Sequence, residues 1–343
     1  MLKKVAFLGM LIFVGLIFFM LRNHAVFPTR LVNLKPSNSP AFTNPLGIDV
    51  MRSNNYPGSD LVIEQTLGDK GNFNEYIASY KSDGLKIYGL LAVPKGEKPK
   101  NGWPVVIFNH GYIAPEQYKT TERYVEYFGT FARNGYIVYK PDYRGNGNSE
   151  GQPEGAYYSP AYSVDVLNAV ASVKRYRDVD VNRIGMWGHS MGGNITLRAI
   201  EVLPDIKAAV IWGGVVGSYD DLMNNWLRRV PFVPSSRQLA LRNSGRSNLV
   251  NLYGVPKDNP NFWNKIDPTY HVDLITAPVQ LHHGEADEEV PLAFSKNLDE
   301  MLMQAGKTVE LFTYPGADHN ISGNSFGVAI GRSLEFFNKY LKH

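Results

Sequence analysis

The alternation of short apolar runs with helical segments most constrains the fold of this 343-residue chain. Short apolar runs rich in Val, Ile and aromatic residues recur from about residue 105 to the C-terminus, separated by segments of helical periodicity. The predicted strands are 105–109, 136–143, 183–187, 208–212, 278–282 and 309–314, and the predicted helices are 121–133, 163–176, 191–203, 292–305 and 328–341. Buried strands separated by helices are typical of a doubly wound α/β fold, whose mainly parallel sheet carries helices on both faces.

Two further regions extend this pattern. Strand-like runs at 61–67, 73–82 and 85–93 come first, and Asp83-Gly84 forms a hairpin turn between the last two, so we expect antiparallel strands at the N-terminal edge of the sheet. Between residues 218 and 266 the alternation lapses, which predicts a partly helical insertion that acts as a lid. Its arginines either bind an anionic substrate or are solvated surface charges; they are Arg228, Arg229, Arg237, Arg242 and Arg246.

The N-terminus predicts membrane targeting. Residues 5–21 are 17 consecutive apolar or glycine positions after Lys3 and Lys4, a run longer than the apolar region of a typical signal peptide. We therefore expect residues 1–22 to be a signal anchor or a signal peptide. Residues 23–59, rich in Pro, Asn and Ser, are expected to be a tether or a wrapping arm, and 60–343 a single catalytic domain. This domain would be extracytoplasmic and membrane-anchored, or secreted if the segment is cleaved.

Charge and cysteine content exclude several functions. Lys plus Arg number 35 against 32 Asp plus Glu, a net charge of +3, which is too balanced to indicate nucleic-acid binding. The chain has no cysteine, which excludes disulfides, zinc–thiolate sites and thiol catalysis. No motif predicts a cofactor, and the oligomeric state cannot be derived from the sequence.

Three stretches match G-x-S-x-G, the pattern of a serine nucleophile on a sharp turn: Gly147–Gly151, Gly188–Gly192 and Gly323–Gly327. Because the chain has 32 glycines, the pattern alone decides little. Such a turn needs a strand before it and a helix after it, and Gly188–Gly192 has both. The other two are expected to be a polar turn and a loop leading into a helix, so Ser190 is the predicted nucleophile.

A serine nucleophile needs a base and an acid that orients the base. His319 follows a predicted strand and is the expected base, and Asp287 follows another and is the expected acid. The competing acids are Asp318, Glu285, Glu288 and Glu289. His282 and His283 suggest a metal site as an alternative, but successive strand residues point to opposite faces, so we expect no metal.

The same reasoning predicts an oxyanion hole, which requires two N–H donors. The backbone of Met191, at the start of a helix, is one candidate. Tyr112, in the glycine-containing loop after strand 105–109, is the other.

Taken together, these motifs resemble the α/β-hydrolase superfamily, and particularly the catalytic domain of the prolyl oligopeptidase family of serine peptidases. The matching segments are 104–111, 135–145, 188–192, 283–287 with 290–291, and 318–319, and 270–278 is close to the family pattern. The resemblance covers about residues 60–343 and implies an α/β-hydrolase fold and a Ser190–Asp287–His319 triad. It departs from the multi-domain members in lacking room for a β-propeller before the core.

We therefore expect a serine hydrolase that cleaves an ester or amide of a small molecule or peptide, with carboxylesterase-like activity as the leading hypothesis. The alternatives are a serine peptidase or aminopeptidase of prolyl oligopeptidase type and a catalytically silent binding or scaffold module.

Overall fold

The structure, a computed structural model, describes residues 42–231, 234 and 236–342. The predicted signal segment, residues 1–22, and residues 23–41 of the predicted tether lie outside this part of the chain. Among the described residues, no helix is both long enough and apolar enough to cross a membrane.

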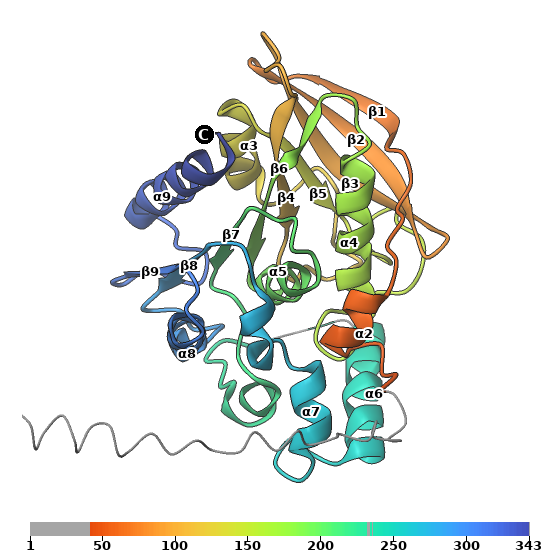
Figure 1. Ribbon diagram of the computed structural model, residues 1–343, viewed down its shortest axis with the longest axis vertical. Helices are drawn as coiled ribbons and strands as arrows, with labels where there is room; N and C mark the ends of the chain where they lie inside the picture. The colour runs from red at the N-terminus through yellow and green to blue at the C-terminus, as the bar shows by residue number, and fades with distance from the viewer. Residues whose placement is uncertain (1–41, 232–233, 235, 343) are drawn as a thin grey trace, which may run out of the picture. The chain divides into compact units, whose positions relative to one another are not determined.

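A nine-stranded sheet runs through the described residues in the order β1-β2-β3-β5-β4-β6-β7-β8-β9 (Figure 1). Its strands are β1 Val62–Asp69, β2 Phe73–Ser82, β3 Leu85–Pro94, β4 Trp103–Asn109, β5 Ile137–Pro141, β6 Val179–His189, β7 Ala208–Trp212, β8 Val279–Gly284 and β9 Val309–Tyr314. Pairing is antiparallel from β1 through β3 to β5 and parallel from β5 to β9. The predicted α/β-hydrolase fold, with its antiparallel N-terminal edge, is confirmed.

Helices cover both faces of the sheet. They are α3 Val125–Arg133, α4 Ala161–Val173, α5 Met191–Val202, α8 Leu292–Gln304 and α9 Asn324–Leu341. The side chains of β4 alternate between two buried apolar clusters: Val105 and Ile107 join α4, α5 and α8, whereas Val106 and Phe108 join α3 and α9. Burial on both faces is why successive residues of β4 are apolar, which makes the strand easy to recognise in the sequence.

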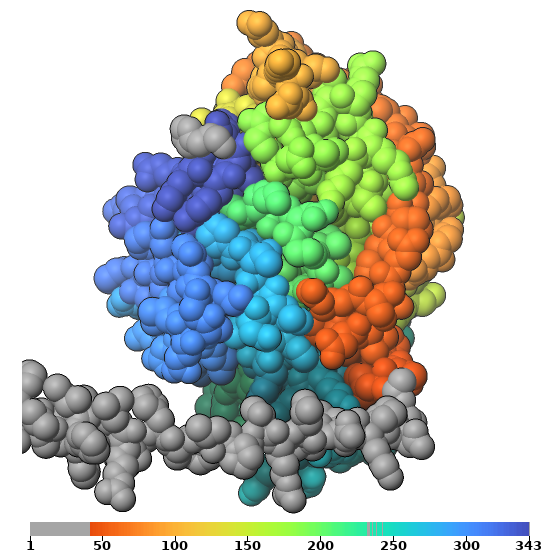
Figure 2. All heavy atoms as spheres, viewed as in Figure 1, coloured from red at the N-terminus to blue at the C-terminus, as the bar shows by residue number. Residues whose placement is uncertain are grey.

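The segment before the sheet packs on the domain from Phe42 onward. It contains α2, Ile48–Ser53, which the sequence analysis did not predict. Ile48 and Met51 of this helix are fully buried, and the Gly58 N–H donates to Asn168 Oδ1 of α4 at 2.8 Å. Figure 2 shows this segment in orange-red along the surface of the molecule. Residues 42–59 are therefore a wrapping arm rather than a free tether.

The predicted insertion, 218–266, is partly helical. Its elements are a π-helix η1, Asp221–Asn225, and two α-helices, α6, Ser236–Tyr253, and α7, Pro260–Ile266. Two short 3-10 helices, η2, Pro268–Tyr270, and η3, Val272–Leu274, then lead back to β8. Tyr253 of α6 stacks on Phe262 of α7 with ring centroids 3.7 Å apart, which joins the two helices.

Candidate active site

Ser190 lies on the turn between β6 and α5, where the sequence placed it. Its backbone has φ 56° and ψ −118°, a left-handed value that is unfavourable for a residue with a side chain and is typical of a nucleophile on a strained strand-to-helix turn. The Ser190 N–H donates to the carbonyl of Trp212 at 2.9 Å, and its own carbonyl accepts from Gly193 and Val215. The bonds with Trp212 and Val215 hold the β6–α5 turn against the end of β7.

The two glycines of this motif are required by close backbone approach. A Cβ added to Gly188 would lie 2.3 Å from the Gly192 carbonyl oxygen, and one added to Gly192 would lie 1.9 Å from the carbonyl oxygen of Asn109. By contrast, a Cβ added to Gly327, in the third motif, would meet nothing within 4 Å. Backbone crowding thus distinguishes Gly188–Gly192 from that motif.

Of the other two serines, Ser149 occupies the polar turn expected for it, whereas α9 begins at Asn324 and so includes Ser325, which was expected in the loop before that helix. Ser149 lies in a turn, and its Oγ accepts from the N–H of Tyr88 at 2.9 Å. Ser325 lies in the first turn of α9. Neither residue lines the cavity described below.

Asp287 and His319 are brought together from the loops after β8 and β9. His319 Nδ1 lies 2.7 Å from Asp287 Oδ2, and both residues are 6% exposed. Since a carboxylate accepts, Nδ1 carries the proton, which leaves the Nε2 lone pair of His319 for another partner. Parallel strands end at one edge of the sheet, so these loops meet the Ser190 turn there.

The Asp287 carboxylate accepts several hydrogen bonds. Oδ1 accepts from the backbone N–H groups of Glu289 and Val290 at 2.8 and 2.9 Å, and His283 Nε2 lies 3.2 Å from Oδ2. Burial opposes ionisation, but the hydrogen bonds from His283 and His319 outweigh it and hold the pKa of Asp287 well below its usual range. The carboxylate is therefore charged at neutral pH.

The alternative acids lie elsewhere. Asp318 accepts from the N–H and Oγ of Ser322 at 2.8 and 2.7 Å, and Glu285 accepts from Thr313 at 2.8 Å. Glu289 pairs with Arg228 at 2.7 Å, and Glu288 is exposed. Asp287 is the one that meets His319.

His282 and His283 point to opposite sides of the sheet, as strand alternation requires. His282 contacts Tyr314 Oη at 2.7 Å, and His283 contacts Ser295 Oγ of α8 at 2.8 Å. Within the described ranges, no group of three potential ligands gathers around a common point. The sequence indicates His283 only as a possible metal ligand, and its contact with Asp287 becomes visible only in the folded chain.

The two expected oxyanion donors flank Ser190. Met191 is the first residue of α5, so no acceptor within the helix is available to its N–H. Tyr112 follows Gly111, where an added Cβ would lie 3.1 Å from Ser190 Cβ. Tyr112, Ser190, Met191 and His319 all line one cavity.

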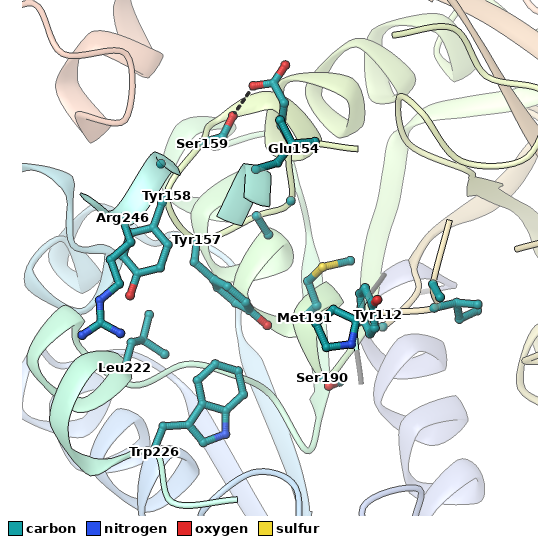
Figure 3. Close-up of a pocket in the computed structure, with 18 of the residues that line it drawn as sticks. Tyr112, Glu154, Tyr157, Tyr158, Ser159, Ser190, Met191, Leu222, Trp226 and Arg246 are labelled. Atoms are coloured by element: carbon teal, nitrogen blue, oxygen red, sulfur yellow. Dashed lines mark hydrogen bonds between the residues drawn. The ribbon is translucent and has the colours of Figure 1, made fainter. Parts of the chain in front are cut away.

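That cavity has a volume of about 1260 Å³ and extends from Ser190 to the insertion. Figure 3 shows Tyr157 and Trp226 on one side of Ser190 and Tyr112 on the other, with Met191 next to Ser190 between them. Beyond Tyr157 and Trp226 lies a further part of the cavity with Leu222 of η1. The predicted lid therefore forms part of the cavity wall.

Two consecutive segments of the chain match two family models. Residues 103–251 match the serine aminopeptidase S33 family, and residues 243–343 match the prolyl oligopeptidase family. The chain is 30% identical over 245 residues to the uncharacterized peptidase YtmA of Bacillus subtilis. The aligned region covers 71% of this chain and 85% of YtmA.

Two further likenesses differ in extent. Human dipeptidyl peptidase 8 is 28% identical over 254 residues, or 71% of this chain, but the chain spans only 26% of that protein. The acetyl xylan esterase of Paenibacillus sp. R4 has the same fold, with a TM-score of 0.61 and 19% identity, over 86% of this chain and 92% of that one. The chain belongs to the α/β-hydrolase superfamily, as a serine hydrolase related to the prolyl oligopeptidase family.

Proposed function

We propose that this serine hydrolase cleaves carboxylic esters through an acyl-enzyme, with Ser190, His319 and Asp287 as its catalytic triad. The observation that carries the proposal is the 2.7 Å bond from His319 Nδ1 to Asp287, beside a serine in a left-handed backbone conformation that lines the same cavity. This arrangement supplies a nucleophile, a base of defined tautomer and an ionised orienting group.

In this mechanism Ser190 Oγ attacks the substrate carbonyl while His319 Nε2 accepts its proton. The backbone N–H groups of Met191 and Tyr112 stabilise the oxyanion. His319 then returns the proton to the leaving group, which departs and leaves an acyl-Ser190. Water activated by His319 attacks this acyl group and regenerates the enzyme.

The charges around the cavity favour esters over peptides with a free amino terminus. A protonated amine needs carboxylates, and the cavity has Glu154 and Glu289, of which Glu289 is paired with Arg228 at 2.7 Å. Arg123 and Arg246 also line the cavity, and neither makes an ion pair within the described part of the chain. A neutral or anionic acyl group suits this environment better than an ammonium group.

Peptidase activity is the second candidate. It is supported by the likeness to YtmA, which is named an uncharacterized peptidase and is matched over most of its length. A pair of substrates with the same acyl group, one an ester and one a peptide amide, separates the two. We expect kcat/KM to be higher for the ester than for the amide, by a factor larger than the ratio of their reactivities without enzyme. A higher kcat/KM for the amide would reverse the assignment.

The nucleophile is tested with a fluorophosphonate probe, which reacts with activated serines. We expect labelling of the wild type, of Ser149→Ala and of Ser325→Ala, and none of Ser190→Ala. Labelling that persists in Ser190→Ala would refute the triad. An unlabelled wild type would favour the silent binding module.

We also propose that residues 1–22 hold the enzyme at a membrane with the catalytic domain extracytoplasmic. The support is the sequence itself: 17 apolar or glycine positions after two lysines. Full-length protein should remain in the membrane pellet after alkaline carbonate extraction, and protease added outside intact cells should reach the domain. Release of a shortened chain into the medium would instead indicate a cleaved signal peptide.

A further inference from the structure

A line of hydrogen bonds passes beside Ser190 and joins the two loops that serve it. The N–H of Gly111, in the loop of the proposed oxyanion donor, donates to Tyr124 Oη at 3.0 Å. Tyr124 Oη lies 2.7 Å from His189 Nδ1, and His189 Nε2 lies 3.0 Å from the backbone oxygen of His319. The line thus begins at the loop before Tyr112 and ends at the proposed base.

The direction of every bond in this line follows from its two ends. The carbonyl of His319 can only accept, so Nε2 of His189 carries the proton. A neutral imidazole then has a bare Nδ1, which accepts from the Tyr124 hydroxyl. Tyr124 Oη in turn accepts from Gly111.

The surroundings of both side chains favour these protonation states. Burial lowers the pKa of His189 to about 3 and raises the pKa of Tyr124, so the imidazole is neutral and the phenol keeps its proton. The His189 ring also lies against the His319 ring, with centroids 4.6 Å apart.

The backbone around Tyr124 is unusual. Arg123 and Tyr124 have φ values of 58° and 54°, so two successive residues with side chains are left-handed immediately before α3. Such conformations persist where surrounding contacts impose them, often at functional sites. Here they bring the Tyr124 hydroxyl within reach of both Gly111 and His189.

We propose that Tyr124 and His189 are positioning residues that keep the oxyanion loop and the base loop in register with Ser190. The inference rests on the proposed triad. Without the Tyr124 hydroxyl, His189 Nδ1 has no hydrogen-bond donor. The two imidazole tautomers of His189 then become closer in energy. In the tautomer with a bare Nε2, the His319 carbonyl loses its hydrogen bond. Both loops then gain freedom next to the reacting atoms.

The test compares Tyr124→Phe and His189→Phe, singly and combined, with Tyr136→Phe as the control. Tyr136 is also buried, and its hydroxyl donates to Asn338 Oδ1 at 2.9 Å, away from the cavity. We expect each single variant at the proposed sites to lower kcat by about 10-fold or more with KM changed less than about 2-fold. The control Tyr136→Phe should keep the wild-type kcat. Its free energy of unfolding should fall by about as much as that of Tyr124→Phe.

The double variant shows whether the two side chains act together. If they form one line of bonds, Tyr124→Phe combined with His189→Phe should lose no more kcat than the worse single variant. Additive losses, a rise in KM in place of the fall in kcat, or unchanged kcat in Tyr124→Phe would overturn the proposal.

A nitrogen-15 NMR spectrum of the histidines reads the tautomer directly and needs no variant to be active. The signals missing from His189→Phe identify His189, and in the wild type at pH 7 they should show a bare Nδ1 and a protonated Nε2. A protonated Nδ1 would overturn the proposal even if Tyr124→Phe did not fold. Probe labelling of wild-type Ser190 is checked first, so that failure of the triad is distinguished from failure of this inference.

Discussion

The crowding at Gly192 allows a sharp prediction for Gly192→Ala. The added Cβ would lie 1.9 Å from the Asn109 oxygen, against 3.4 Å or more in an ordinary contact, so that oxygen would have to move by about 1.5 Å. The carbonyl carbon of Asn109, at 2.5 Å, and the oxygen of His110, at 2.8 Å, are crowded as well. Backbone atoms cannot rotate away as a flexible side chain can.

The displaced Asn109 carbonyl belongs to the segment that leads to Tyr112. Asn109 ends β4, and the proposed oxyanion donor follows three residues later. A misplacement of about 1 Å at catalytic groups costs on the order of 100-fold in rate. We therefore expect Gly192→Ala to lose about 100-fold or more in kcat/KM toward an ester, together with a lower Tm.

Gly331→Ala is the matched control. Gly331 lies within α9, and a Cβ added there would meet nothing within 4 Å. Since alanine favours a helix over glycine by about 1 kcal/mol, this variant should keep its activity and gain stability. The measurements are kcat/KM and the Tm of both variants. A Gly192→Ala enzyme within about 3-fold of wild-type activity and with an unchanged Tm would refute the steric reasoning, whereas one that cannot fold beside a soluble Gly331→Ala would agree with it.

Three further predictions concern Asp287 and Arg246. Asp287→Asn should lower kcat by about 10³–10⁴-fold, because an amide no longer stabilises the His319 imidazolium or fixes its tautomer. Stopped-flow or steady-state assays measure this loss. A loss below about 10-fold would contradict the role of Asp287 as the acid that orients His319. Because the pKa of Asp287 is held below its unfolded value, the ionised carboxylate contributes stability above about pH 4, and this contribution is lost as the pH falls further. The stability difference between wild type and Asp287→Asn in urea should therefore shrink from pH 7 to pH 3, and a constant difference would contradict the linkage. Arg246→Gln should reduce kcat/KM a few-fold for an ester whose acyl group ends in a carboxylate and leave the neutral analogue unchanged; equal effects on both esters would show that Arg246 does not recognise charge.

The residue pattern predicted the elements of the central sheet closely. The run 208–212 was predicted as a strand and is β7, and 191–203 was predicted as a helix and is α5, Met191–Val202. Every residue of both elements is buried. Strand β7 is apolar throughout, whereas α5 carries apolar residues at helical spacing and also buries Asn194, Thr196, Arg198 and Glu201. Helix α2 was not predicted, because its buried residues lie among prolines, asparagines and serines that are typical of a tether.

Contacts between distant residues required the folded chain. His283 was considered as a metal ligand, yet its ring lies 3.2 Å from the Asp287 carboxylate. The sequence does not indicate a functional role for Tyr124, because nothing in a helix-like run shows that its hydroxyl contacts Gly111 and His189. No motif marks either contact.

Sequence alone therefore predicted the order of strands and helices along the chain, the choice of Ser190 among three similar motifs, and His319 as the base, with Asp287 as the favoured one of several candidate acids. These follow from local periodicity, from turn chemistry and from the rule that parallel strands end at one edge of a sheet. Only the tertiary structure decided which acid meets His319, how closely Gly192 approaches β4, and which buried side chains support the proposed triad. Such contacts depend on backbone positions to within about an ångström across residues 32 to 130 positions apart, and hydrophobic periodicity carries no information on that scale.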